Sequence, residues 1–158
     1  MTRPTEKLIK VVKSLQKRRY PVILVLQYEN ASLTSRDVEL VSQTCTLSRI
    51  NYREDVLARP ASGIILGAYL RGHFVEWLLE QARKTDGLII EKVDELIASW
   101  PEPDRLAFFM DFLHIECNVF KDPTRRIPIL ILSHLASRYD LPTSSRGQGI
   151  VFDLSRYQ

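Results

Sequence analysis

The segment 22–26 reads Val-Ile-Leu-Val-Leu and holds no polar residue. A strand that is apolar throughout is typical of a parallel strand buried on both faces, because neither side of it meets water. Further strands are predicted at 47–52, 88–90, 127–132 and 150–154, separated by helical or irregular stretches. Strands that alternate with helices predict a three-layer α/β/α fold, with a mostly parallel sheet of about five strands covered on both faces.

Hydrophobic periodicity predicts the helices that cover this sheet. The first carries Leu8, Val12 and Leu15 on one side and lysines on the other. Others are expected at 35–44, over 64–83 and from Asp104 through Phe120. The predicted packed faces of the last two consist of Leu66, Leu70, Phe74, Trp77 and Leu78, and of Leu106, Phe109, Met110, Leu113, Cys117 and Phe120.

Length and composition predict a single domain over residues 1–158, with the basic segment 1–19 packed on it. The 158 residues, 45% of them hydrophobic, suffice for a three-layer core without disulfides or metal. Cys45 and Cys117 are too isolated for a disulfide framework or a zinc site. No apolar stretch reaches the roughly 18 residues of a membrane span, and no signal-peptide core follows Met1. We therefore expect a cytoplasmic protein without a membrane partner.

The loop after the first strand has the position of a phosphate-binding loop but lacks its residues. When the pattern G-x-x-x-x-G-K-S/T is laid over it, Gln27 and Ser32 replace the glycines and Leu33 replaces the lysine. Thr34 alone fits, and it can also cap the following helix. Side chains at the glycine positions obstruct phosphate, and Leu33 supplies no ammonium group. No cofactor is expected, and ATP with Mg²⁺ bound through main-chain groups is the alternative.

Two titratable residues follow later strands. Glu91 ends the third strand, where P-loop proteins place the acidic residue that handles Mg²⁺, but a carboxylate there is also common in other α/β domains. His134 follows the fourth strand, at the edge where open α/β sheets bind ligands, and a hydrogen-bonded structural histidine is the alternative. Asp111 and His114 have metal-ligand spacing, but nothing nearby completes a set, so no metal site is predicted.

The N-terminal segment predicts a basic surface. Such a face can bind nucleic-acid phosphates without sequence preference, although lysine-rich solvated faces are also common. The residues concerned are Lys7, Lys10, Lys13, Lys17, Arg18 and Arg19.

In the order of its elements, the chain resembles a degenerate P-loop NTPase of the additional-strand group, which includes the AAA+ ATPases. The resemblance rests on the basic first helix, the strand 22–26 with its loop through Thr34, and the strands 88–91 and 129–133. Length and layout are also similar to the small P-loop proteins of BREX-type phage-defence systems. The resemblance implies a P-loop NTPase-like fold and a place in a defence or other DNA-handling complex.

These observations favour a non-hydrolysing P-loop-like accessory subunit that associates with a larger complex or with copies of itself. Its expected contact surfaces are the basic helix and exposed loops around Trp100 and Arg146. One alternative is a nucleotide-binding ATPase with an atypical Walker A loop. The other is a small nucleic-acid-binding protein that uses its basic N-terminal helix.

Overall fold

The sheet has parallel strands throughout and is the central layer of the fold. The computed structural model describes residues 4–15, 21–25, 35–59, 63–66, 68–85, 87–115, 129–141 and 150–153. The strands lie in the order β2-β3-β4-β1-β5, and every pairing is parallel. They are β1 (Val22–Val25), β2 (Ser48–Asn51), β3 (Leu88–Glu91), β4 (Ile129–Ser133) and β5 (Ile150–Asp153). The predicted α/β class with a parallel sheet is confirmed.

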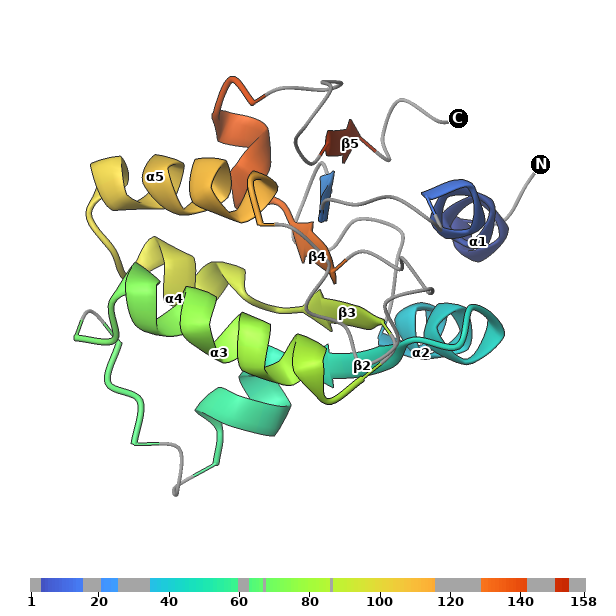
Figure 1. Ribbon diagram of the computed structural model, residues 1–158, viewed down its shortest axis with the longest axis horizontal. Helices are drawn as coiled ribbons and strands as arrows, with labels where there is room; N and C mark the ends of the chain where they lie inside the picture. The colour runs from blue at the N-terminus through green and yellow to red at the C-terminus, as the bar shows by residue number, and fades with distance from the viewer. Residues whose placement is uncertain are drawn as a thin grey trace.

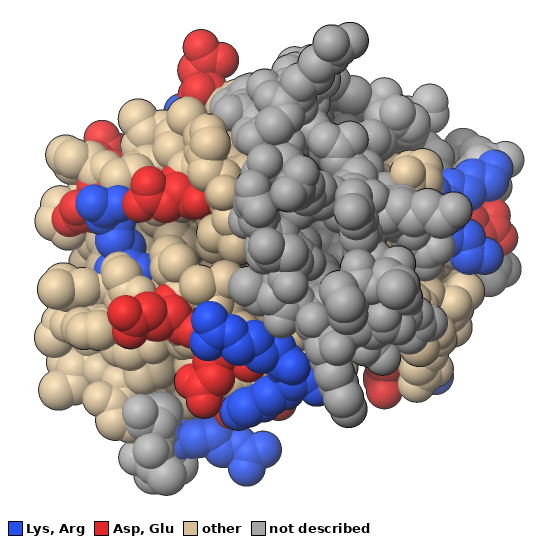
Figure 2. All heavy atoms as spheres, in the orientation of Figure 1, with Lys and Arg blue, Asp and Glu red and all other residues tan. Residues whose placement is uncertain are grey.

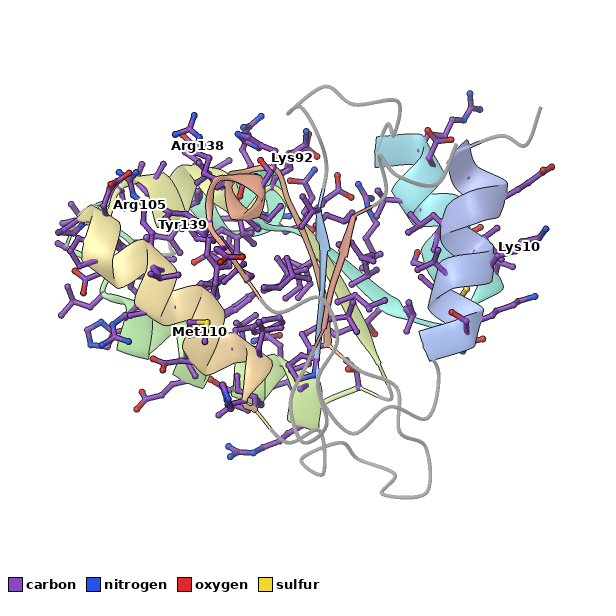
Figure 3. The ribbon with its side chains drawn as sticks, turned by 90° about the horizontal axis from the view of Figure 1, so that it is seen from above. Lys10, Lys92, Arg105, Met110, Arg138 and Tyr139 are labelled. Atoms are coloured by element: carbon purple, nitrogen blue, oxygen red, sulfur yellow. The ribbon has the colours of Figure 1, made fainter. Side chains whose placement is uncertain are left out.

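Helices cover both faces of the sheet, which Figure 3 shows edge-on between them. One face is covered by α1 (Pro4–Leu15) and α2 (Ser35–Thr44), and α2 has the predicted bounds. The other face is covered by α3 (Arg71–Arg83), α4 (Asp94–Ala98) and α5 (Glu102–Leu113) (Figure 1). Two short turns complete the described elements, the π-helical η1 (Arg53–Leu57) and the 3₁₀ η4 (Leu135–Arg138).

The two layers of helices enclose two separate apolar cores. Alternate residues of β1 point to opposite faces, so Ile23 and Val25 belong to one core and Val22 and Leu24 to the other. In the second core, α1 packs its apolar stripe against β1 and α2 through Leu8, Val11 and Val12. The all-apolar sequence of β1 follows from this burial on both sides.

Aromatic rings fill the core beneath α3 and α5. Phe108 is fully buried, and its ring centroid lies 5.3 Å from that of Phe74 and 5.5 Å from that of Trp100. Tyr52 meets Phe74 edge-on at 5.2 Å. Such tilted and edge-to-face contacts are favourable beyond the area that they bury. This cluster joins α3, α5 and the segment between α4 and α5 into one layer.

The phenol of Tyr52 is buried in this cluster with an oxygen that meets no hydrogen-bond partner among the described residues. Burial raises the pKa of Tyr52 well above its usual value of 10.0. The folded protein therefore retains a proton that the unfolded chain releases at high pH. The contribution of Tyr52 to stability is complete below pH about 10 and is lost as the pH rises through the folded-state pKa.

We expect Tyr52→Phe to raise the free energy of unfolding by about 1 kcal/mol at neutral pH, because it removes a buried hydroxyl that has no hydrogen-bond partner in the described part of the chain. The variant should also lose less stability than the wild type above pH about 10. Urea unfolding followed by circular dichroism, repeated across this pH range, measures both effects. A destabilised variant, or one with an unchanged alkaline slope, would contradict this account.

The segment before α3 and the end of α5 differ from the prediction. Residues 64–66 and 68–70 of the predicted helix are not helical, and α3 begins only at Arg71. Leu66 and Leu70, expected on a packed face, are 44% and 57% exposed. The predicted helix through Phe120 ends at Leu113, and residues 116–120 lie outside the described part. Leu106, expected in its packed stripe, is also exposed.

Among the described helices, none has the length and apolar character that a membrane span requires.

Candidate functional site

The carboxyl edge of the sheet brings together the two titratable residues singled out in the sequence. Strands β3 and β4 are parallel neighbours, so Glu91 at the end of β3 and His134 just after β4 lie at the same edge. Ligands of open α/β sheets bind at this edge. Each of the two side chains is nevertheless engaged by a different partner.

Glu91 forms an ion pair inside the protein. Its side chain is 4% exposed, and its Oε2 accepts a hydrogen bond of 2.8 Å from Nε of Arg49 on the neighbouring strand β2. This hydrogen bond raises the pKa of Arg49, so the guanidinium stays charged. A positive group therefore already faces the carboxylate that would hold Mg²⁺ in a P-loop enzyme. A divalent cation would have to compete with that guanidinium.

His134 belongs to a network centred on Asp94, at the start of α4. The hydroxyl of Ser133, a fully buried residue, donates to Oδ1 of Asp94 at 2.5 Å. Oδ2 of the same carboxylate accepts the backbone N–H of His134 at 2.9 Å and lies 2.5 Å from its Nδ1. The backbone N–H of Ala136 in turn donates to the Ser133 hydroxyl. Asp94 thus fixes the end of β4 and orients the imidazole.

Sequence reasoning missed Asp94 as the partner of His134. The two residues are 40 positions apart and meet only because β3 and β4 are adjacent. The available signal was an aspartate shortly after the end of a strand, in the first turn of a helix. That position alone does not specify a partner.

The end of β2 is held by a similar local network. The backbone N–H of Asn51 donates to Oδ2 of Asp55, and Oδ1 of Asn51 accepts the N–H of Glu54. Lys92, directly after Glu91, has a φ of 63°, an uncommon conformation for a residue with a side chain. Figure 3 shows Lys92 and Arg138 at this same edge. The described polar groups here mainly bind one another.

The structure gives Asp111 and His114 separate partners. Asp111 accepts a hydrogen bond from Arg71, and Nδ1 of His114 lies 2.7 Å from the carbonyl oxygen of Met110. In the described ranges, no group of three or more His, Cys, Asp or Glu side chains gathers as metal ligands do. Cys45 is buried with a free thiol.

Several predicted site residues lie outside the described part of the chain. These are the loop residues Gln27, Ser32, Leu33 and Thr34 and the basic residues Lys17, Arg18 and Arg19. Lys7 is in α1, but the placement of its side chain is not described. Lys10 and Lys13 are exposed on α1, and Figure 3 shows Lys10 pointing away from the sheet.

A second region of interest is an open cavity of about 890 Å³ beside the start of α3 and α5. In the segment around Trp100, Pro101, Glu102 and Pro103 are exposed as expected. Trp100 itself is only 2% exposed, and its indole N–H donates to the carbonyl oxygen of Tyr69 at 2.6 Å. Trp100 instead forms part of the cavity lining, with Leu70, Arg71, Gly72, His73, Val75, Glu76, Pro101, Asp104 and Asp111. Arg146 lies outside the described residues.

The chain matches no protein-family model, and comparisons with curated proteins and with solved structures gave no significant match.

Proposed function

We propose that the protein is a non-hydrolysing P-loop-like accessory subunit that works by association with other macromolecules. The observation that carries this proposal is the ion pair between Arg49 and Glu91. The Glu91 carboxylate at the end of β3 is paired with the guanidinium of Arg49. In the loop that follows β1 in the sequence, Leu33 stands where an ATPase needs lysine. The ion pair disfavours binding of Mg²⁺, and the missing lysine disfavours binding of a triphosphate.

The strand order supports the P-loop-like part of the proposal. The additional-strand group takes its name from a strand inserted between the one that leads into the phosphate loop and the one that ends in the acidic residue. Here β4 lies between β1 and β3, and Glu91 ends β3. Following the resemblance in the sequence, we place the subunit in a phage-defence or other DNA-handling complex.

Nucleotide assays test the proposal directly. We expect no release of phosphate from ATP or GTP with Mg²⁺, and no shift in melting temperature with ATP, ADP or GTP. A ligand at about 100 times its dissociation constant would stabilise the fold by about 2.7 kcal/mol, which a thermal shift detects. Turnover that Glu91→Gln abolishes would refute the proposal and favour the alternative, an ATPase with an atypical Walker A loop.

A second candidate function, nucleic-acid binding, is favoured by the outward-facing lysines of α1. Lys10 and Lys13 are exposed on the side of the helix opposite its buried Leu8 and Val12. If this face binds phosphates, affinity for a labelled duplex should fall steeply between about 50 and 200 mM salt. The charge reversals Lys10→Glu and Lys13→Glu should then abolish the gel shift. Binding that ignores both salt and these changes would exclude α1 as the contact.

A further inference from the structure

Three aliphatic side chains next to the cavity beside α3 are exposed to solvent. Ile65 is 70% exposed, and Leu66 and Leu70 are also largely exposed. In the same segment, Ile64 and Tyr69 are partly buried and pack against the core, which anchors the backbone of residues 64–69 to the protein. The backbone N–H groups of Ala68 and Tyr69 both donate to the carbonyl oxygen of Ile65, which closes a turn. We call Ile65, Leu66 and Leu70 the aliphatic ridge, which lies on the loop at the lower left of Figure 1.

The cavity continues this apolar surface towards α5. Leu70 belongs both to the ridge and to the cavity lining, where Val75, Trp100 and Pro101 add further apolar surface. Leu70 and Asp111 remain more than half exposed, so the cavity is an open groove. Sites for small molecules enclose most of the ligand, and an open groove beside exposed aliphatic residues fits the side of a helix better.

The charged residues of the groove have an excess of carboxylates. Arg71 lies between Asp104, at 3.7 Å, and Asp111, at 2.5 Å, and Glu76 is a further exposed acid of the lining. His73 uses Nδ1 to accept the backbone N–H of Leu70. Figure 2 shows acidic and basic side chains next to one another on the left of this face, within mostly uncharged surface. Among the described lining residues, one guanidinium faces three carboxylates, so this part of the rim attracts positive charge.

We propose that the aliphatic ridge and the groove bind an amphipathic helix of a partner protein, with an apolar stripe flanked by lysine or arginine. The apolar stripe would cover the ridge, and the flanking cations would meet Glu76, Asp104 and Asp111. This inference rests on the proposed accessory function and identifies the surface through which the subunit associates. Exposed aliphatic groups rimmed by polar residues are typical of such interaction sites.

Peptide binding to the full-length protein tests this inference. The probe is a fluorescein-labelled helical peptide of about 18 residues, with leucines at i, i+3, i+4 and i+7 and lysines beside them. One companion peptide has glutamate for every lysine, and another has serine for every leucine. Fluorescence anisotropy should give affinities at least about tenfold weaker for both companions, because each removes one of the two complementary features.

Matched variants locate the contact. The double variant Leu66→Ser with Leu70→Ser should weaken binding at least about tenfold, while Leu40→Ser should leave it within about twofold. Leu40 is a suitable control because it is also half exposed but lies on α2, across the sheet. The double variant Asp104→Asn with Asp111→Asn should weaken binding of the lysine peptide and strengthen binding of the glutamate peptide.

Several outcomes would overturn the inference. They are no binding of the leucine–lysine peptide, equal binding of the glutamate peptide, and equal effects of the ridge and Leu40 variants. Sedimentation that shows a dimer dispersed by the ridge variant would mean that a second copy occupies the groove. ATP turnover would refute the proposed function alone, because these peptide affinities do not depend on nucleotide.

Discussion

Replacing Arg49 with alanine is expected to lower the free energy of unfolding by about 3 kcal/mol. The substitution removes the guanidinium that lies 2.8 Å from the Glu91 carboxylate, a side chain that is only 4% exposed. Buried charges are costly when their counter-ion is removed, because water cannot replace it. Urea unfolding of the purified variant, monitored by circular dichroism at neutral pH, gives the difference.

Arg53→Ala provides the matched control. Arg53 pairs with Glu95 at 3.2 Å, but both side chains are nearly half exposed. Ion pairs in contact with water contribute at most about 1 kcal/mol, so this variant should remain close to the wild type. Equal losses for the two arginine variants would show that burial of the Arg49–Glu91 pair has no energetic consequence. Replacing both members, as Arg49→Met with Glu91→Leu, should recover part of the loss.

We expect Phe108→Ala to destabilise the protein by about 3–5 kcal/mol, because it opens a cavity at the centre of the aromatic cluster. The ring of Phe108 is fully buried and contacts Phe74, Trp100, Phe109 and Phe112. These residues come from α3, α5 and the segment between α4 and α5, so several elements lose packing at once. The urea midpoint, with the slope of the transition checked against the wild type, measures the change.

The control for this prediction is Leu106→Ala on the same helix. Leu106 is 40% exposed, so its truncation removes less buried surface, and we expect a loss of less than about 1 kcal/mol. A loss at Leu106 as large as that at Phe108 would indicate that α5 responds to any substitution. The aromatic cluster would then not explain the effect.

The sequence was sufficient to predict those elements whose burial is uniform or periodic. β1 lies between two helical layers, and its unbroken apolar run follows directly from that position. The bounds of α2 were predicted because Val38 and Val41 repeat on one side of it and Ser35 begins it. In such segments, local pattern and tertiary environment agree.

Two features of the structure could not be predicted from the local pattern of the sequence. Leu66 and Leu70 match the spacing of a helical stripe, yet they lie in an irregular segment and face water. A periodicity argument assumes that apolar residues are buried, and it fails where they stay exposed. The pairing of Arg49 with Glu91 joins residues 42 positions apart, and only the parallel register of β2 and β3 brings them together.

The strand order also sets the sequence of events by which the chain can fold. β1 has β4 and β5 as its neighbours, and Val22 lies opposite Leu130 and Ile150. Until residues 129–153 have left the ribosome, β1 is an apolar strand with both edges unpaired. Contacts so distant in sequence slow folding and prolong exposure of surfaces that aggregate. The sheet is therefore completed only after β4 and β5 have been synthesised, and a nascent chain that lacks them has no partner strands for the apolar β1.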